Sequence, residues 1–362
     1  MANPDHADLH SSLQTPMSAA LILAAGLGSR LRPLTLERPK PLVEVLGTPL
    51  IFYALEKAYQ AGVKQIAINT HHLGDALQAA VGDAFKGIPI RYAAETQLLG
   101  TGGGIRNLAE TLGGIPMTFA VMNADALIDI DLQRMCRLHA QSGVSATLAL
   151  KDTEDKARFG LIGTDSDERV RTFAGRTRYQ GPVARERMFC GVHVLEPPIL
   201  ERLPLGEESC INQIGYPPLL DEGGDVLGFD APGYFCDVGT PERLFGANMD
   251  LLGGRVSFRH FNPFERFTRH ADTAGNPLYL GRDVQLPPDW RDRLKGPLLL
   301  DDGVVLEAGA QVGPFVIAGK NCRIGAGARL LQVVLQSGAE IEADSERSSA
   351  VIGRTCRMDI SI

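Results

Sequence analysis

The sequence lacks a long hydrophobic run, an excess of basic charge and closely spaced cysteines. Its longest apolar run near the start, residues 19–25, is far shorter than the roughly 18 residues that span a bilayer, so no transmembrane helix is predicted. Lys and Arg total 36 against 43 Asp and Glu, and the net charge of −7 argues against a nucleic-acid or membrane partner. The six cysteines form no C-x-x-C pair, which suits reduced thiols in a cytoplasmic protein.

The N-terminus also lacks the basic patch and apolar core of a secretory signal. Residues 1–17 are predicted to form a disordered tail, and Met17 is itself a candidate start residue. At about 150 residues per domain, the length of 362 residues predicts roughly two domains.

Short apolar runs alternate with helix-like segments over the first 250 residues, which indicates βαβ units. We therefore expect residues 18–250 to form a Rossmann-like α/β domain, with a mostly parallel sheet covered by helices on both faces. Ligands of such sheets bind beyond the carboxyl ends of the strands. The strand candidates are residues 19–25, 65–69, 90–93, 119–122, 146–150 and 191–195.

The C-terminal part of the chain has a different periodicity. Small or apolar side chains recur there every six residues, at Val312, Ala318, Ile324 and Leu330. This period predicts a small left-handed parallel β-helix of hexapeptide repeats over residues 299–362, with a run of short β-hairpins as the alternative. Residues 251–298 are expected to connect the two domains or to start the β-helix early. We expect the β-helix to mediate homo-oligomerisation, because stacked coils offer flat faces for packing.

A glycine-rich loop with three cations follows the first strand candidate. Its glycines permit tight turns, so that backbone N–H groups can line an anion nest, and its three cations favour a triphosphate ligand. Neither the Walker A motif nor the dinucleotide fingerprint fits the loop, and a plain strand-to-helix turn is the alternative. These glycines and cations are Gly26, Gly28, Arg30, Arg32 and Lys40.

Two aspartates, distant in sequence, each follow an apolar stretch. Asp125 stands in NAD after TFAVM, and Asp237 stands in FCDVGTPERL. Two carboxylates from separate strand ends, completed by phosphate oxygens, suit Mg²⁺. Taken singly, each aspartate is more simply explained as a helix cap.

The string G-x-G-[ST]-R-x-x-P-x-T followed by P-K-P, together with LGTGGG, NAD and DVGTPE, resembles the sugar-1-phosphate nucleotidyltransferase family over about residues 19–248. The resemblance implies that Arg30 and Lys40 are catalytic and that Asp125 and Asp237 bind Mg²⁺. It also implies a set of nucleotide-binding residues, namely Ala24, Ala25, Gly26, Gly28, Ser29, Glu95, Gly100, Thr101, Gly102 and Asn123.

The sugar side departs from the family pattern. Many members carry E-K-P, whose lysine touches the sugar phosphate, whereas this chain has Phe-Ala-Gly-Arg at 173–176. The pattern looks closer to the N-acetylmuramate-1-phosphate uridylyltransferase and mannose- or heptose-1-phosphate guanylyltransferase branches. Residues 158–160 resemble the sugar-side Y/F-G and residues 189–195 a strand closing the sugar pocket. The resemblance thus implies Gly160 as a sugar-phosphate residue. At the departure from the pattern, Arg176, with Arg178 as an alternative, is our candidate for the charge that the missing lysine would supply.

The implied reaction is an in-line attack of a sugar 1-phosphate on the α-phosphate of a nucleoside triphosphate. The attacking oxygen is already anionic, so catalysis needs charge neutralisation and positioning rather than a general base. Glu95 favours GTP over UTP as the nucleotide substrate, but UTP stays an alternative. A non-catalytic nucleotide-sugar-binding regulatory subunit is the alternative, but such subunits tend to lose the basic and metal-binding residues that this chain retains.

Overall fold

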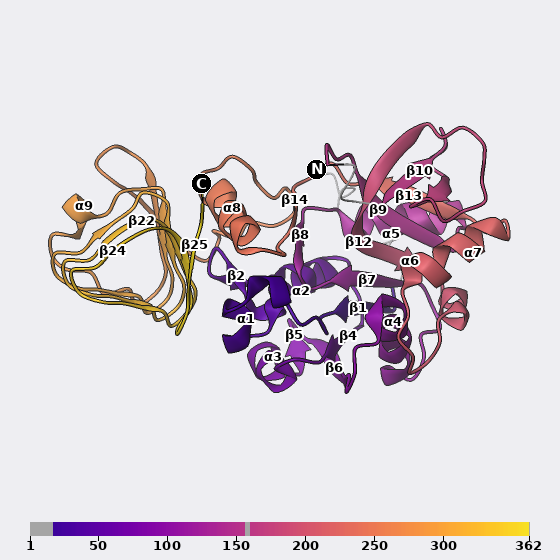
Figure 1. Cartoon of the computed structure of the whole chain (residues 1–362), viewed down its shortest axis with the longest axis horizontal. Coiled ribbons are helices and arrows are strands. Elements are labelled where there is room, and N and C mark those ends of the chain that lie inside the picture. Colours follow the sequence, from indigo (N-terminus) through magenta and orange to yellow (C-terminus); the bar gives the residue numbers. More distant parts are fainter. Residues whose placement is uncertain (1–16, 156–159, 362) are drawn as a thin grey trace, which may run out of the picture.

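The computed structural model describes residues 17–155 and 160–361 (Figure 1). Arg158 and Phe159 of the predicted sugar-side motif therefore lie outside the described residues. Met17, which the sequence assigns to the tail, is instead buried in the core with 2% of its surface exposed. Among the described residues, no helix combines the length and the apolar character of a membrane span.

A ten-stranded sheet forms the N-terminal domain, with the strand order β11-β10-β12-β7-β1-β4-β6-β5 and with β9 joining β12 to β13. The strands β7, β1, β4 and β6 are parallel, whereas β12 runs antiparallel to its neighbours. The predicted α/β fold is confirmed. The strands are β1 (Ala19–Leu23), β4 (Gln65–Thr70), β5 (Ala84–Phe85), β6 (Ile88–Ala94), β7 (Phe119–Asn123), β9 (Ala146–Lys151), β10 (Leu161–Thr164), β11 (Val170–Phe173), β12 (Arg185–Leu195) and β13 (Val226–Asp230).

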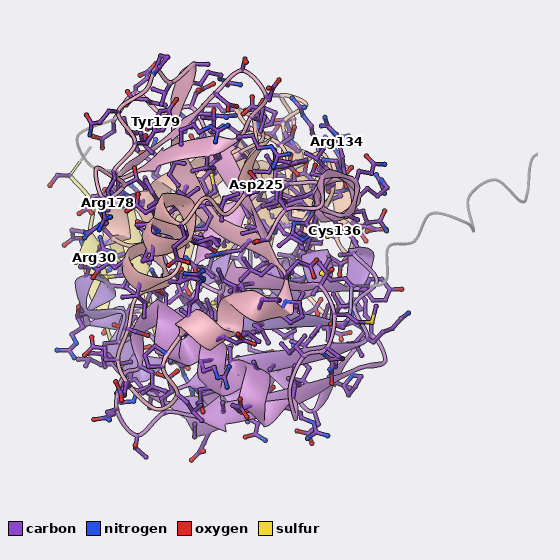
Figure 2. The ribbon with its side chains drawn as sticks, turned by 90° about the vertical axis from the view of Figure 1, so that its right-hand side faces the viewer. Arg30, Arg134, Cys136, Arg178, Tyr179 and Asp225 are labelled. Carbon is purple, nitrogen blue, oxygen red and sulfur yellow. The ribbon has the colours of Figure 1, made fainter. Side chains whose placement is uncertain are left out.

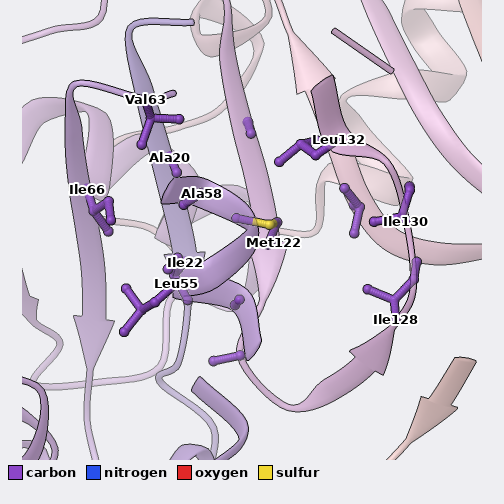
Figure 3. Close-up of a cluster of buried hydrophobic side chains, with 14 of the residues drawn as sticks. Ala20, Ile22, Leu55, Ala58, Val63, Ile66, Met122, Ile128, Ile130 and Leu132 are labelled. Carbon is purple, nitrogen blue, oxygen red and sulfur yellow. The ribbon is translucent and has the colours of Figure 1, made fainter. Parts of the chain in front are cut away.

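Helices cover both faces of this sheet, which explains why β1 is apolar throughout. Ala20 and Ile22 pack on one face with Leu55 and Met122 (Figure 3), while Leu21 packs on the other face. Burial on both sides is typical of a central parallel strand. The first face carries α2 (Leu50–Gln60), α3 (Gly74–Val81) and α5 (Leu132–Ser142), and the second carries α4 (Gly100–Thr111), α6 (Ile211–Ile214) and α7 (Tyr216–Asp221).

The order of the strands creates a switch point beside β1. The chain proceeds from β1 outward to β4 and β6 and then returns to β7 on the other side of β1. Ligands of open α/β sheets bind at such a point, beyond the carboxyl ends of the strands. Several short elements surround this edge: η1 (Ser29–Leu31), α1 (Leu34–Glu37), η2 (Lys40–Leu42), β2 (Glu44–Val45), β3 (Thr48–Pro49), β8 (Ala126–Ile128) and β14 (Phe235–Asp237). The short helix η3 (Pro197–Arg202) follows β12 at the opposite edge of the sheet, where Leu195 pairs with Phe119.

The C-terminal domain is a stack of parallel coils (Figure 1). Successive coils place Leu299, Ile317, Val334 and Val351 in register, 17 or 18 residues apart, which is about three six-residue steps. Parallel pairing already begins at β16, so residues 277–298 belong to the stack. Its strands are β15 (Thr268–Ala271), β16 (Pro277–Leu280), β17 (Leu298–Leu300), β18 (Val305–Leu306), β19 (Gln311–Val312), β20 (Val316–Ala318), β21 (Arg323–Ile324), β22 (Arg329–Leu335), β23 (Glu340–Ile341), β24 (Glu346–Ile352) and β25 (Arg357–Asp359), with the short helix α9 (Trp290–Arg293).

One face of this β-helix packs against the N-terminal domain. The residues Leu299, Ile317, Val334 and Val351 point out of the coils and join a shared core with α8 (Pro241–Leu252). Their chain neighbours point into the coils and fill the interior of the β-helix. Successive side chains along each short strand therefore point alternately into the β-helix interior and toward the N-terminal domain. The two domains thus share a buried apolar interface.

Candidate active site

The two predicted metal-binding aspartates lie side by side. Strand β14 pairs antiparallel with β8, and this register sets Asp237 opposite Ala126, the residue after Asp125. Their side chains are 39% exposed for Asp125 and 27% exposed for Asp237. A short ribbon thus brings together two carboxylates that are far apart in sequence.

Lys40 reaches between these carboxylates. Its Nζ lies 2.7 Å from Asp125 Oδ2 and 3.9 Å from Asp237 Oδ1, and its side chain is only 7% exposed. Arg243 also reaches the pair, with Nη1 3.0 Å from Asp237 Oδ2. Sequence reasoning missed Arg243, although it stands in the DVGTPERL motif at the start of α8. The two acidic side chains are therefore surrounded by cations that suit bound phosphates.

Arg30 lies on the open side of the same group. A Cβ built on Gly239 would lie 2.9 Å from Arg30 Nη2 and 3.0 Å from Asp237 Oδ1. A side chain at this glycine of DVGTPE would therefore displace the guanidinium or the carboxylate by a few tenths of an ångström. Arg30 follows Gly28, which adopts a left-handed conformation at φ 60°; the hydroxyl of Thr35 donates to the Gly28 carbonyl at 2.9 Å.

The glycine-rich loop is tied to the neighbouring strand ends by Asn69. Asn69 Oδ1 accepts from the backbone N–H of Ala24 at 2.6 Å, and its Nδ2 donates to Glu95 Oε1 at 2.7 Å. Glu95 Oε2 accepts from the backbone N–H of Leu99 at 3.0 Å. Glu95 is thus buried and orders the loops, and its recognition of a base stays a prediction. Asn69 is a residue that the sequence analysis missed, at the end of β4.

The glycines of LGTGGG have a packing role in the structure. The backbone N–H of Gly102 donates to the carbonyl of Ser209 at 2.8 Å, and a Cβ on Gly103 would collide with the carbonyl oxygen of Glu207. Thr101 Oγ1 accepts from the backbone N–H of Ile211 at 3.2 Å. The segment 207–211 therefore covers this part of α4, and the nucleotide contacts implied for Gly100, Thr101 and Gly102 stay predictions.

A cavity of about 290 Å³ opens beside the acidic pair. Asn123, another predicted residue, lines it close to Gly191, whose left-handed φ of 74° leaves room for the amide. Strand β12 supplies part of the wall, as expected for residues 189–195. The lining residues are Thr101, Asn123, Asp125, Ala126, Phe189, Cys190, Gly191, His193, Ile211, Asn212, Phe235 and Asp237.

Asn212 and His193 are lining residues that sequence reasoning missed. Asn212 Oδ1 is buried and has no hydrogen-bond partner within the described part of the chain. His193 Nδ1 shares a hydrogen bond with the hydroxyl of Tyr216, and burial lowers the pKa of His193 to about 3. His193 is therefore a neutral, fixed part of the wall, whereas the Asn212 amide is poised to accept from a ligand.

The predicted sugar-phosphate residues lie outside this cavity lining. Gly160 stands beside Ala174, and Arg176 is exposed. The Arg178 side chain is 91% exposed, with Nε 3.7 Å from Asp221 Oδ2; it lies beside Tyr179 at the surface, on the same side of the view as Arg30 (Figure 2). The structure thus brings Arg30, Lys40, Asp125 and Asp237 together but leaves Gly160 and Arg176 apart from them.

Comparison with known proteins connects this geometry to a family. A family model described as "Nucleotidyl transferase" matches residues 19–254, which include the acidic pair and both predicted catalytic cations. The chain belongs to the nucleotidyl transferase family. The resemblance found in the sequence motifs is confirmed.

Relatives of this nucleotidyl transferase match along most of both domains. The mannose-1-phosphate guanylyltransferase of Mycobacterium tuberculosis is 30% identical over 326 residues, which are 90% of this chain and 81% of the relative. The UTP–glucose-1-phosphate uridylyltransferase of Synechocystis sp. is 27% identical, over 85% of this chain and 80% of the relative. A probable mannose-1-phosphate guanylyltransferase 1 of Oryza sativa subsp. japonica is 26% identical, over 92% and 85%.

The acidic pair of this nucleotidyl transferase has the composition that Mg²⁺ requires. Both carboxylates lie within ion-pair distance of one cation, Lys40 Nζ, so the two acidic side chains converge on a common point. Across residues 17–155 and 160–361, no cluster of three or more His, Cys, Asp or Glu side chains could hold a metal alone. Mg²⁺ is commonly held by one or two carboxylates with substrate phosphates and water, so Asp125 and Asp237 fit a metal shared with phosphate.

Proposed function

We propose that this nucleotidyl transferase joins GTP or UTP to a sugar 1-phosphate, releasing pyrophosphate and forming a nucleotide-sugar. The observation that carries the proposal is the convergence of Lys40, Asp125 and Asp237 beside a cavity with amide and aromatic walls. The names of the relatives, which are guanylyl- and uridylyltransferases of sugar 1-phosphates, support both bases and the sugar 1-phosphate.

The reaction makes one P–O bond and breaks another. An oxygen of the sugar phosphate attacks the α-phosphorus of the triphosphate, the bond between the α- and β-phosphates breaks, and pyrophosphate leaves with that electron pair. No proton needs to move, because the attacking oxygen is already anionic. His193, neutral and bonded to Tyr216, is consistent with this absence of general-base chemistry.

The residues of the chain then act through charge and position. Lys40 lies next to the acidic pair and steadies the phosphates at the reacting centre, while Arg30 on the exposed loop neutralises the departing pyrophosphate. Mg²⁺, held by Asp125 and Asp237, would supply positive charge shared by the phosphates of both substrates. Such neutralisation lowers the repulsion between two anionic reactants.

The cavity beside the acidic pair is the proposed sugar site. Phe189 and Phe235 offer apolar surface to a sugar ring, and the amides of Asn123 and Asn212 offer hydrogen-bond partners to its hydroxyls. Gly160 and Arg176 belong to exposed segments beside β10 and β11, outside the cavity lining, and their contact with the sugar phosphate stays a proposal made from the sequence.

We further propose that the enzyme works in the cytoplasm as a homo-oligomer assembled through its β-helix. The face with Leu299 and Ile317 already packs against the N-terminal domain, so copies would meet through the remaining faces, such as the sheet β18-β21-β23. Sedimentation equilibrium of the full chain tests the assembly. A charge-reversal such as Arg323→Glu on that sheet should shift the equilibrium toward monomer, whereas a monomeric wild type contradicts the proposal.

The proposed reaction is tested by incubating the full chain with Mg²⁺ and each of GTP, UTP, ATP, CTP and dTTP, crossed with hexose, aminosugar, muramate and heptose 1-phosphates. Mass spectrometry of the product identifies base and sugar together. We expect a nucleotide-sugar with GTP or UTP, loss of product with EDTA, and recovery with excess Mg²⁺. If no substrate pair gives a product but the protein still binds nucleotide-sugars, the result would support a regulatory subunit instead.

A further inference from the structure

The β-helix contacts the segment of the N-terminal domain that carries Lys40. We call residues 37–44 the Lys40 segment. Polar contacts from two turns of the β-helix, at 336–337 and at 354–355, meet this segment at its two ends, Glu37 and Glu44. We propose that the β-helix is a positioning element of the active site, which fixes Lys40 against Asp125 through these two contacts. The catalytic part of this inference rests on the proposed function.

The contact at Glu44 is buried, and it gives hydrogen-bond partners both to the Gln336 amide and to the backbone of Glu44. Gln336 is fully buried; its Oε1 accepts from the Glu44 backbone N–H at 2.8 Å, and its Nε2 donates to the Glu44 carbonyl at 3.0 Å. The Glu44 carboxylate accepts from the Ser337 backbone N–H at 2.9 Å and pairs with Arg38 Nη1 at 3.2 Å. Buried polar groups lose much free energy when their partners are removed, so this pairing fixes the register of the backbone.

The contact at Glu37 fixes the other end. Glu37 Oε1 accepts from the backbone N–H and the hydroxyl of Thr355, at 2.8 and 2.9 Å, and Oε2 accepts from the Arg354 backbone N–H at 2.9 Å. Burial raises the pKa of Glu37, but the hydrogen bonds from Cys356, Thr355 and Arg354 outweigh it and lower the pKa. The ionised carboxylate is therefore the form that the second turn holds.

Between these two ends the backbone has little freedom. Pro39 and Pro41 flank Lys40 and restrict the backbone torsion φ, and the buried side chain of Lys40 runs from η2 to Asp125. The two turns of the β-helix are themselves stacked, since the Gln336 backbone N–H donates to the Ile352 carbonyl at 2.9 Å. A shift of either turn thus moves the Lys40 backbone, and misplacement of about 1 Å can lower a rate about a hundredfold.

A simple role in holding the domains together would predict different behaviour. Loss of general stability lowers the amount of folded enzyme, whatever residue occupies position 40. A positioning role instead makes the effect of Gln336 depend on Lys40, because the two residues then act through one interaction. A double-mutant cycle separates the two roles.

The test uses Gln336→Met in the full chain, since methionine preserves the length of the side chain and removes both hydrogen bonds to Glu44. We expect kcat to fall about tenfold or more, with KM for both substrates within about twofold. In a Lys40→Met background the same change should lower kcat less than twofold. An equal loss in both backgrounds, or no loss in the wild-type background, would overturn the proposal.

Ile341→Ala is the control, because Ile341 lies in the β-helix interior on β23, away from the shared interface. It should lower the melting temperature yet keep kcat within about twofold of wild type. A loss of kcat as large as that of Gln336→Met, at a similar melting temperature, would contradict a specific role of Gln336.

Hydrogen exchange gives a readout that does not require turnover. The backbone amides of residues 40–45 should exchange faster in Gln336→Met than in Ile341→Ala, while the amides of β1 and β7 stay protected in both. If wild type shows no turnover with any substrate pair, the proposed function fails, and this comparison still decides whether the β-helix orders the Lys40 segment. Equal exchange in the two variants would overturn that ordering.

Discussion

The ammonium nitrogen of Lys40 lies 2.7 Å from Asp125 Oδ2, although the two residues are 85 positions apart in sequence. The same nitrogen lies 3.9 Å from Asp237 Oδ1. The nearly buried Lys40 ammonium thus lies between the carboxylates of Asp125 and Asp237, so positive and negative groups alternate at this edge of the sheet. The phosphates of the two substrates can bind to the positive groups, and a divalent cation can bind to the carboxylates. We therefore assign the proposed nucleotidyl transfer to Lys40, Asp125 and Asp237.

Lys40→Met should lower kcat about a hundredfold, since it removes a positive charge beside the reacting phosphates. The fold should persist, because methionine fills most of the same space. Initial rates and melting curves measure the two effects. Lys86→Met is the control, because the Lys86 side chain is 46% exposed and pairs with Glu56 away from the site. A loss below threefold for Lys40→Met would contradict the role of Lys40.

Asn212→Ala should raise KM for the sugar 1-phosphate about fivefold and leave KM for the nucleoside triphosphate unchanged. The reason is that Asn212 Oδ1 is buried in the cavity without a partner among the described residues, and one hydrogen bond contributes roughly 1 kcal/mol. The neighbouring exposed Gln213→Ala serves as the matched control. Equal changes in both KM values would argue against a sugar contact.

Local patterns predicted much of the fold. The run at 19–23 is apolar on both faces of β1 because helices cover both sides of the sheet, and the six-residue period appears as the in-register stack from Val312 to Leu330. The motif residues Arg30, Lys40, Asp125 and Asp237 also converge as expected. These features follow from short-range spacing, which the sequence displays directly.

Gly103→Ala should destabilise the fold by about 1–3 kcal/mol, because its Cβ would collide with the Glu207 backbone. Gly246→Ala should instead stabilise it by about 0.5–1 kcal/mol, since Gly246 lies in α8 with open space around its Cβ. Urea unfolding compares the two helical glycines directly. Similar effects of the two variants would show that segment 207–211 does not need Gly103.

The remaining features depend on pairing between distant parts of the chain. Glu207 approaches Gly103 closely, and the Gln336 amide both accepts from the Glu44 backbone N–H and donates to the Glu44 carbonyl. Neither contact produces a periodic pattern in the sequence of the segments involved. Asn69 stands one residue before the end of β4 as an ordinary polar residue, and its link between Ala24 and Glu95 appears only when three strands are aligned. Tertiary packing, rather than local propensity, decides these positions.

Stability should fall with acid in a way that depends on His193. The pKa of His193 is lowered by burial to about 3 from an ordinary 6.5. Between these two pH values, His193 is protonated in the unfolded chain but neutral in the folded chain. The free energy of unfolding therefore decreases as pH falls, by up to about 1.4 kcal/mol per pH unit. Urea unfolding of wild type and His193→Gln at pH 5, 6 and 7 tests this effect. Identical slopes against pH would contradict it.

The central claim is that the pair formed by Asp125 and Asp237 performs metal-assisted nucleotidyl transfer. Its most direct test is the rate of pyrophosphate release with Mg²⁺ by wild type and by Asp125→Asn, at saturating triphosphate and sugar 1-phosphate, with the exposed Asp83→Asn as control. We predict that Asp125→Asn keeps the wild-type fold and loses a factor of about a hundred or more in rate, while Asp83→Asn stays near wild type. Near-wild-type release by Asp125→Asn would contradict the account.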